Sequence, residues 1–226
     1  IKVPELYNCN AGFYDFQTKI KLWINDKNNL LINFYSSSDN FQLHSDTTYN
    51  YNNTIASLIL KHKFNSKLKL NTSLISSLFN YRISNENSID QSFSLTHHLT
   101  NVSFINDFEC LTNTRMKYVF GTAFNFYSIN PGERKVPDNS NIAPINSSNE
   151  HALEYGIYAG TEFNISGKVK IEGGIRLSGL ISFDDGKKYI YADNLPYSVD
   201  NVVDTVFSSK SSISKIYLNP EWRLSL

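Results

Sequence analysis

The sequence predicts an all-β protein: an antiparallel transmembrane β-barrel wall of about nine long meander strands. Three observations predict this class. Aromatic residues make up 14% of the 226 residues, with 14 Tyr and 15 Phe. Apolar and polar residues alternate with a period of two, as in a strand with one greasy and one wet face. The segments between these runs alternate between short and long, as the turns and loops of an outer-membrane barrel do.

The first predicted strand covers about residues 12–24. Its apolar face holds Tyr14, Phe16, Thr18, Ile20, Leu22 and Ile24, and its polar face holds Asp15, Gln17, Lys19 and Lys21. Two further strands are predicted at about 30–36 and 53–64. In the second of these, Leu58 alternates with Ser57 and Lys61.

The middle of the chain predicts strands at about 68–81, 93–111 and 115–128. Leu70 and Leu74 alternate with lysine, asparagine and serine, and Phe120 belongs to a run in which every second residue is apolar. The segment 93–111 alternates least cleanly. Several of these runs reach the nine to eleven residues that a tilted strand needs to cross a bilayer.

The last three predicted strands cover about 150–164, 169–182 and 215–226. Alternation is sharpest in the second of these, where Ile171 and Ile175 oppose lysine, glutamate and glycine. Pro220 lies inside the final strand and removes one ladder donor there.

The connections predict the orientation of the wall. Short turns are expected on the periplasmic side and long polar loops outside. The short turns lie at 25–28, 65–66, 112–114 and 166–167, and the long segments lie near 37–52, 82–92, 129–149 and 183–214. A soluble β-sandwich with one buried face would explain the alternation, but not this sorting of the connections.

Composition excludes several classes of protein. Lys+Arg and Asp+Glu each number 21, so no positive field exists to hold nucleic acid. No run of about 18 apolar residues predicts a spanning helix. The chain starts at Ile1, so we expect any export signal to be removed or to lie outside this sequence. Cys9 and Cys110 are expected at opposite ends of the wall and unbonded to each other.

Catalytic and metal chemistry find little support. No Gly-x-Ser-x-Gly or His-Glu-x-x-His string occurs, so the sequence predicts no enzyme, no metal and no cofactor. His97 and His98 would face opposite ways on a strand, which makes joint ligation difficult, even with His44 and His151 available. Asp184-Asp185-Gly186 is typical of a turn, with Ca²⁺ binding as the alternative.

The candidate ligand contacts are aromatic residues in or after the last long loop, because exposed aromatic rings can stack on sugars or chelates. They are Tyr189, Tyr191, Tyr197 and Trp222. Charged residues on the polar faces are expected to line a wet lumen. They are Glu154, Glu162, Lys170, Glu172 and Arg176.

Several stretches, in order along nearly the whole chain, resemble the barrel of TonB-dependent receptors from Bacteroidetes-type bacteria. They are 13–20, 31–36, 53–58, Phe120-Gly121 with 129–132, 162–166, 174–178 and the closing Pro220-Glu221-Trp222-Arg223-Leu224-Ser225. In that family the barrel has about twenty-two strands, a plug fills it, and a segment near the N-terminus engages TonB. The resemblance therefore implies that residues 1–226 are part of such a barrel, without plug or coupling segment.

The function implied by the resemblance is TonB-coupled uptake of a scarce nutrient across the bacterial outer membrane. Iron chelates, cobalamin and glycans are the substrate classes of the family, and the lipid bilayer and TonB are the expected partners. Two alternatives stay open: a soluble or surface-attached β-sandwich that binds polysaccharide, and a smaller barrel that closes on itself and acts as an adhesin or enzyme.

Overall fold

The computed structural model describes residues 9–42, 47–85, 91–138, 140–167, 169–183, 186–196, 198, 201–207 and 212–226. The described chain forms one ten-stranded antiparallel sheet and one two-stranded sheet. The large sheet holds β1 (Asn10–Asn25), β2 (Asn28–Gln42), β3 (Thr47–Lys63), β4 (Leu68–Asn85), β5 (Phe93–Leu111), β6 (Met116–Lys135), β7 (Ile145–Asn146), β8 (Glu150–Ser166), β9 (Val169–Phe183) and β12 (Ile213–Ser225). The small sheet holds β10 (Lys187–Tyr191) and β11 (Val202–Phe207).

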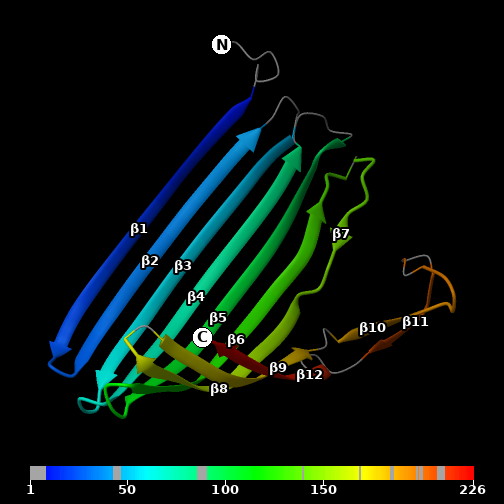
Figure 1. Ribbon diagram of the computed structural model, residues 1–226. Helices are drawn as coiled ribbons and strands as arrows, with labels where there is room; N and C mark the ends of the chain where they lie inside the picture. Colours follow the sequence, from blue (N-terminus) through cyan, green and yellow to red (C-terminus); the bar gives the residue numbers. More distant parts are fainter. Residues whose placement is uncertain are drawn as a thin grey trace.

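The large sheet is a meander. Each long strand pairs with the next along the chain, in the order β1-β2-β3-β4-β5-β6-β8-β9-β12, while the short β7 pairs only with β6. Figure 1 shows this sheet curling into a trough, with β8, β9 and β12 turning across the front. The nine predicted strands and their antiparallel order are confirmed.

Three of the short turns are closed in the same way, by an asparagine side chain. The Oδ1 of Asn25 accepts hydrogen bonds from the backbone N–H groups of Lys27 and Asn28, at 3.0 and 2.9 Å. Asn65 and Asn113 each accept two backbone N–H groups in the same positions of their own turns. Asparagine supplies this local acceptor readily, so the sequence fixes these turns at one rim.

The other ends of the strands differ from the prediction. The polar segment 37–52 was expected to be a loop, but β2 continues to Gln42 and β3 begins at Thr47. The segments 82–92 and 129–149 are likewise shortened, because β4 reaches Asn85 and β6 reaches Lys135. The expected loop 183–214 contains the β10–β11 hairpin.

The convex face of the sheet carries the large apolar side chains, and they are exposed. Leu58 is 45% exposed, Phe120 41% and Ile175 68%, whereas Ala123 is the one hydrophobic residue classed as buried in the described chain. The other sheet of the described chain is the two-stranded β10–β11 pair, and the exposure of these side chains shows that no second sheet covers this face. The β-sandwich alternative is therefore wrong.

The apolar surface forms a band of limited height on strands β2–β6. On β4 it extends from Leu70 to Leu78, nine residues along the strand, which is the length a tilted strand needs to cross a bilayer. Beyond it, towards the long connections, the same convex face turns polar. The register aligns Ser38, Asn52, Asn80, His98 and Asn130 across five neighbouring strands. These five strands thus continue past the apolar band at that end.

β1 and β12 are the two edges of the described sheet. Pro220 lies on β12 opposite Leu177, and an edge strand can accommodate a proline because one side of its backbone needs no ladder partner. A small barrel that closes through its own first and last strands is not formed by the described residues. Cys9 precedes β1 at the long-connection rim and Cys110 lies near the opposite rim, as expected. No described helix is long and apolar enough to cross a membrane.

Candidate functional site

The concave face of the trough holds two polar and aromatic regions that face the same interior space. The pairing register sets both, because residues directly opposite one another on neighbouring strands share a face. One region lies at the ends of β2–β5 towards the long connections, and the other lies across β5, β6, β8, β9 and β12. Both regions are built from the residues that alternate along each strand with the exposed apolar residues, and so they lie on the opposite face.

The first region is a row of stacked rings, here called the aromatic row: Phe41, Tyr49, Tyr51, Tyr81 and His97. Phe41 lies against Tyr49 with ring centroids 4.8 Å apart and planes 7° from parallel. Tyr51 and Tyr81 stack at 4.6 Å, and Tyr81 continues to His97 at 5.8 Å. The row therefore crosses four strands, β2 to β5, without interruption.

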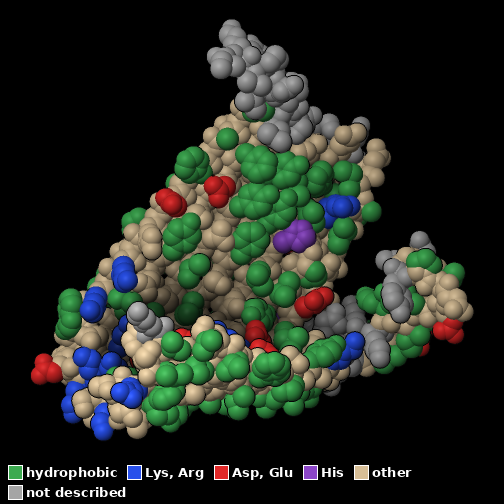
Figure 2. Space-filling model, viewed as in Figure 1, with side chains coloured by type: hydrophobic (Ala, Val, Ile, Leu, Met, Phe, Trp, Pro, Cys, Tyr) green, Lys and Arg blue, Asp and Glu red, His purple; other side chains and the backbone are tan. Residues whose placement is uncertain are grey.

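The aromatic row lies beyond the apolar band of the convex face. Tyr81 follows Asn80, the β4 member of the convex polar line, and so lies past the level where a bilayer would end. Figure 2 shows hydrophobic side chains gathered on the concave surface at this end of the trough, with a histidine beside them. The rings cover each other's faces, so they present their edges and phenol groups to the interior. Such a surface suits a ligand that offers both apolar contact and hydrogen-bond acceptors.

The second region consists of acidic and basic side chains that form ion pairs, and it is here called the paired-charge region. Glu162 lies 3.2 Å from Lys117 and 3.0 Å from Lys170, and Glu172 lies 3.3 Å from Arg223. These groups come from β6, β8, β9 and β12, so the pairs connect neighbouring strands. The expectation that Glu154, Glu162, Lys170, Glu172 and Arg176 share one inward face agrees with this register.

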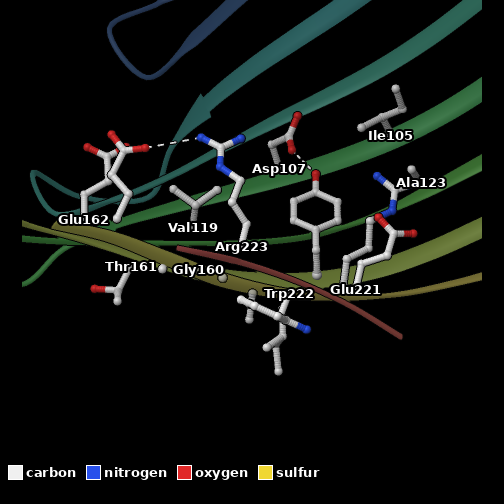
Figure 3. A pocket seen from close by; sticks show the side chains of 17 residues that line it. Ile105, Asp107, Val119, Ala123, Gly160, Thr161, Glu162, Glu221, Trp222 and Arg223 are labelled. Atoms are coloured by element: carbon white, nitrogen blue, oxygen red, sulfur yellow. Dashed lines mark hydrogen bonds and ion pairs between the residues drawn. The ribbon is translucent and has the colours of Figure 1, made fainter. Parts of the chain in front are cut away.

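The paired-charge region continues towards the aromatic row through Glu154 and Tyr158. Glu154 accepts a hydrogen bond of 3.0 Å from the Tyr127 hydroxyl and lies 3.7 Å from Arg176. The Tyr158 hydroxyl donates to Asp107 across β6. A cavity of about 850 Å³ is lined by these strands. Figure 3 shows Glu162, Arg223 and Asp107 projecting into it from one side of the sheet.

Glycine makes room for these side chains. A Cβ on Gly121 would lie 2.6 Å from the Tyr158 hydroxyl and would also collide with the backbone oxygen of Asn106. A Cβ on Gly156 would lie 2.9 Å from the Arg176 guanidinium.

The structure describes three of the four predicted ligand contacts, and these three do not lie together. Tyr189 and Tyr191 lie on β10, in the small sheet, and Tyr197 lies outside the described residues. Trp222 lies on β12 opposite Ile175 and is 84% exposed. Figure 3 shows Trp222 on the opposite side of the sheet from Glu162 and Arg223. The structure therefore does not bring Trp222 together with the two described tyrosines.

The position of each described histidine on its strand determines the face on which its side chain lies. His97 stacks on Tyr81 at the concave face, while His98 on the convex face bonds to the Asn80 side chain. His151 stacks on Phe126, and His44 lies outside the described residues, as do Asp184 and Asp185. Within the described ranges no three His, Cys, Asp or Glu residues are placed to hold a metal ion.

Sequence reasoning missed the aromatic row. Phe41, Tyr49 and Tyr51 fall in the segment 37–52 that was expected to be a loop, and Tyr81 ended a predicted strand. The Tyr-x-Tyr spacing at 49 and 51 was the available signal, because two residues apart on a strand share a face. Tyr127 also lies on the concave face, where its hydroxyl donates a hydrogen bond to Glu154.

Comparisons with known proteins agree with the fold. The family model described as Opacity family porin protein matches residues 66–192. No curated protein sequence matches the chain.

Two solved proteins have a similar fold over nearly the whole chain. The copper transporter OprC matches 96% of it, with a TM-score of 0.69 and 8% identity. The ferric-catecholate import receptor Fiu of E. coli K12 matches 97% in its closed form, with a TM-score of 0.64, and 96% in its open form, with a TM-score of 0.58; identity is 10% in both. The chain spans 34% of the length of OprC and 41% and 44% of the two Fiu chains. At these identities the likeness concerns the fold.

Proposed function

Because the chain belongs to the Opacity porin family, whose model matches residues 66–192, we propose that it forms part of the barrel wall of an outer-membrane uptake receptor. The chain lies in the bacterial outer membrane. In this proposal the receptor is of the TonB-dependent, Bacteroidetes type, and it takes up a scarce nutrient such as an iron chelate, cobalamin or a glycan. The chain contributes wall and outer ligand-facing surface, and it is not an enzyme.

The observation that carries the proposal is the division of the concave face. The aromatic row lies at the outer end of the strands, where a ligand arriving from outside meets it first. The paired-charge region lies further along the lumen, where Glu162 and Glu172 neutralise their basic neighbours and keep the lumen hydrated. OprC is a copper transporter and Fiu is a ferric-catecholate import receptor, and this supports an uptake role for the wall.

The proposed dependence of uptake on TonB follows from the proposal that the receptor is of the TonB-dependent type. A plug domain and a coupling segment are proposed partners of this wall, and the wall supplies the lumen in which a plug moves. Energy coupling distinguishes this function from diffusion, because it makes uptake depend on TonB and on the proton gradient.

The test is uptake by cells with and without the gene for this chain. Radiolabelled ferric chelates, cobalamin and oligosaccharides are supplied under starvation for each. We expect one class to be taken up only when the gene is present, and that uptake to stop on deletion of TonB or addition of a protonophore. Gene-dependent uptake that continues without TonB would reject the coupled mechanism.

A second candidate is a passive pore, favoured by the porin description of the matching family. The same experiment separates the two candidates. A pore carries solute in proportion to its external concentration and is insensitive to protonophore, whereas a coupled receptor saturates and accumulates its ligand.

A further inference from the structure

The convex face carries an apolar groove of about 870 Å³ where β5, β6, β8, β9 and β12 lie side by side. We call it the convex groove, and the side chains that form it include Phe108, Phe120, Ile157, Ala159, Ile175 and Trp222. Tyr158 and Arg176 contribute their backbone, because strand alternation turns their side chains to the concave face, towards Asp107 and Glu154. The convex groove is therefore separate from the cavity on the other side of the sheet.

A small residue between large ones opens the convex groove. Phe108, Phe120, Ala159, Ile175 and Trp222 form one row across five neighbouring strands. Phe108 and Phe120 stack with ring centroids 5.0 Å apart and form one wall. Trp222 is 84% exposed on this side of the sheet (Figure 3) and lies three strands from Phe120, roughly 14 Å away. Ala159 places only a methyl group beside the Phe120 ring, so the row is open there.

A row nearer the middle of the apolar band shows the contrast. Leu58, Leu74, Phe104 and Phe124 follow one another across β3 to β6, all with similar exposure and without a small residue among them. A hydrocarbon chain that lies on this row contacts side chains below it only. In the convex groove the same chain has the phenylalanine wall on one side and Trp222 on the other. Since each additional apolar contact adds dispersion and burial energy, a chain in the groove is held longer.

The lining determines the chemistry of the occupant. Among the lining side chains on the convex face, only Thr122 and the indole of Trp222 carry a polar group. A sugar or a peptide would leave its own hydrogen-bonding groups unpaired there, which is unfavourable. The row of Phe120 is also the row of Leu70 on β4, so the groove is continuous with the apolar band. Its occupant is therefore a hydrocarbon chain supplied by the bilayer.

The nearest turn supplies a contact for a lipid phosphate. Arg115 lies in the short turn before β6, is exposed, and forms no ion pair within the described residues. From Arg115 to Phe120 the strand rises roughly 17 Å, which is roughly 12 Å of depth for a strand tilted by about 45°. One leaflet of hydrocarbon is roughly 15 Å thick. A phospholipid with its phosphate at Arg115 can thus lay an acyl chain in the groove.

We propose that the convex groove is a binding site for one acyl chain of a phospholipid, whose phosphate contacts Arg115, and that this lipid stays with the wall while bulk lipid exchanges. The inference depends on the convex face lying in the bilayer. It depends neither on coupling to TonB nor on the nutrient that is carried.

Photolabelling of the purified receptor in detergent tests this proposal, because detergent dilutes bulk lipid and leaves only lipid held at a site. The probe is an equimolar amount of phospholipid with a diazirine in its acyl chain, and mass spectrometry maps the labelled residues after irradiation. Ile157, Ile175 or Trp222 should be labelled several-fold more than Leu58 and Leu74. Equal labelling of the two sets would reject the site.

Two alanine variants on the same face provide a matched comparison. Ala159→Phe fills the convex groove and should abolish the excess labelling. Ala56→Phe adds the same ring to the convex face of β3, opposite Phe34 and Ser76, and should leave the excess unchanged. Arg115→Gln should reduce the labelling several-fold. Excess labelling that survives in Ala159→Phe, or that is lost equally in Ala56→Phe, would contradict the assignment to the groove.

Competition in the unmodified protein identifies the lipid and needs no variant. Unlabelled phospholipid should displace the photoactivatable lipid, and lipid A should not. Displacement by lipid A alone would reject a phospholipid as the source of the chain. Disulfide-linked dimers of an Ala159→Cys variant in native membranes would assign the groove to a second copy of the chain instead.

Uptake measurements separate this inference from the proposed function, because photolabelling involves no transport. Labelling of the groove without TonB-dependent uptake would uphold the lipid site and reject the receptor mechanism. Uptake without excess labelling would do the reverse.

Discussion

Side chains at alternate positions of one strand meet different surroundings in this wall. Leu58 and Phe120 belong to the convex apolar face, at 45% and 41% exposure, while Glu172 on the concave face lies 3.3 Å from Arg223. Exposure of large apolar groups without a second layer of protein is stable only if lipid covers them. The two faces therefore have opposite tolerance for charge.

Replacing Leu58 or Phe120 with Arg should lower the free energy of unfolding by about 2–4 kcal/mol near the bilayer midplane. Glu172→Gln should cost less than about 1 kcal/mol, because an ion pair this exposed contributes little. Lys61→Gln should be equally mild, because Lys61 lies on the polar concave face and makes no ion pair within the described residues. Urea unfolding in phospholipid vesicles, followed by tryptophan fluorescence, measures both sets. Equal losses at the two faces would contradict lipid exposure.

Gly121 offers a second residue-level prediction. Gly121→Ala should reduce stability by about 1–3 kcal/mol, because its Cβ meets the Asn106 backbone and the Tyr158 ring. Gly12→Ala is the matched control, since nothing lies within 4 Å of the Cβ that it adds. The same unfolding assay compares the two variants, and a similar effect of both would refute the account of close strand approach at Gly121.

At the level of strands, the aromatic row connects four of them, β2 to β5, at their ends towards the long connections. Each stacked aromatic pair contributes about 0.5–1.5 kcal/mol. If the row also contacts ligand, Tyr51→Ala and Tyr81→Ala should weaken binding of the transported nutrient by about threefold to tenfold. Phe126→Ala, which removes a ring from the convex face, is the control. Titration of the purified receptor with the nutrient identified by uptake gives the answer, and equal affinities for all three variants would exclude the row from the binding site.

The β10–β11 hairpin carries the remaining prediction of ligand contact. Replacing residues 184–212 with a two-residue Asn-Gly turn should leave the large sheet folded, because β9 and β12 still pair. Loss of Tyr189 and Tyr191 should weaken ligand binding. Binding that is unchanged in a folded variant would show that these tyrosines make no contact.

The strands could be predicted within the apolar band, because a bilayer requires apolar and polar residues to alternate there. They could not be predicted beyond the band. Within the apolar band, residues such as Leu74 and Phe120 mark the phase of each strand. Beyond it both faces meet water, so the run from Ser36 to Asn40 contains no apolar residue that would mark an alternation, and its composition is typical of a loop. The aromatic row was hidden for the same reason, and because its stacking depends on the register of four strands, which no single segment reveals.

For the whole molecule, one curved sheet presents lipid-facing and water-facing surfaces with nothing packed on either in the described residues. The concave face carries the aromatic row at the ends of β2–β5 and the paired-charge region across β6, β8, β9 and β12. This division follows from the pairing register and from the charges of the inward side chains. The family match and the fold of OprC and Fiu are in agreement with an outer-membrane barrel.

The most direct test of this account is the accessibility of spin labels placed one by one along β4, from position 70 to 79, in a variant without Cys9 and Cys110. In vesicles, labels at Leu70, Leu74 and Leu78 should collide mainly with dissolved oxygen. Labels at Asn71, Ser73 and Ser77 should collide mainly with a water-soluble nickel chelate, which gives a period of two along the strand. Equal access of the nickel chelate to every position would contradict the claim that one face of this sheet lies in lipid and the other in water.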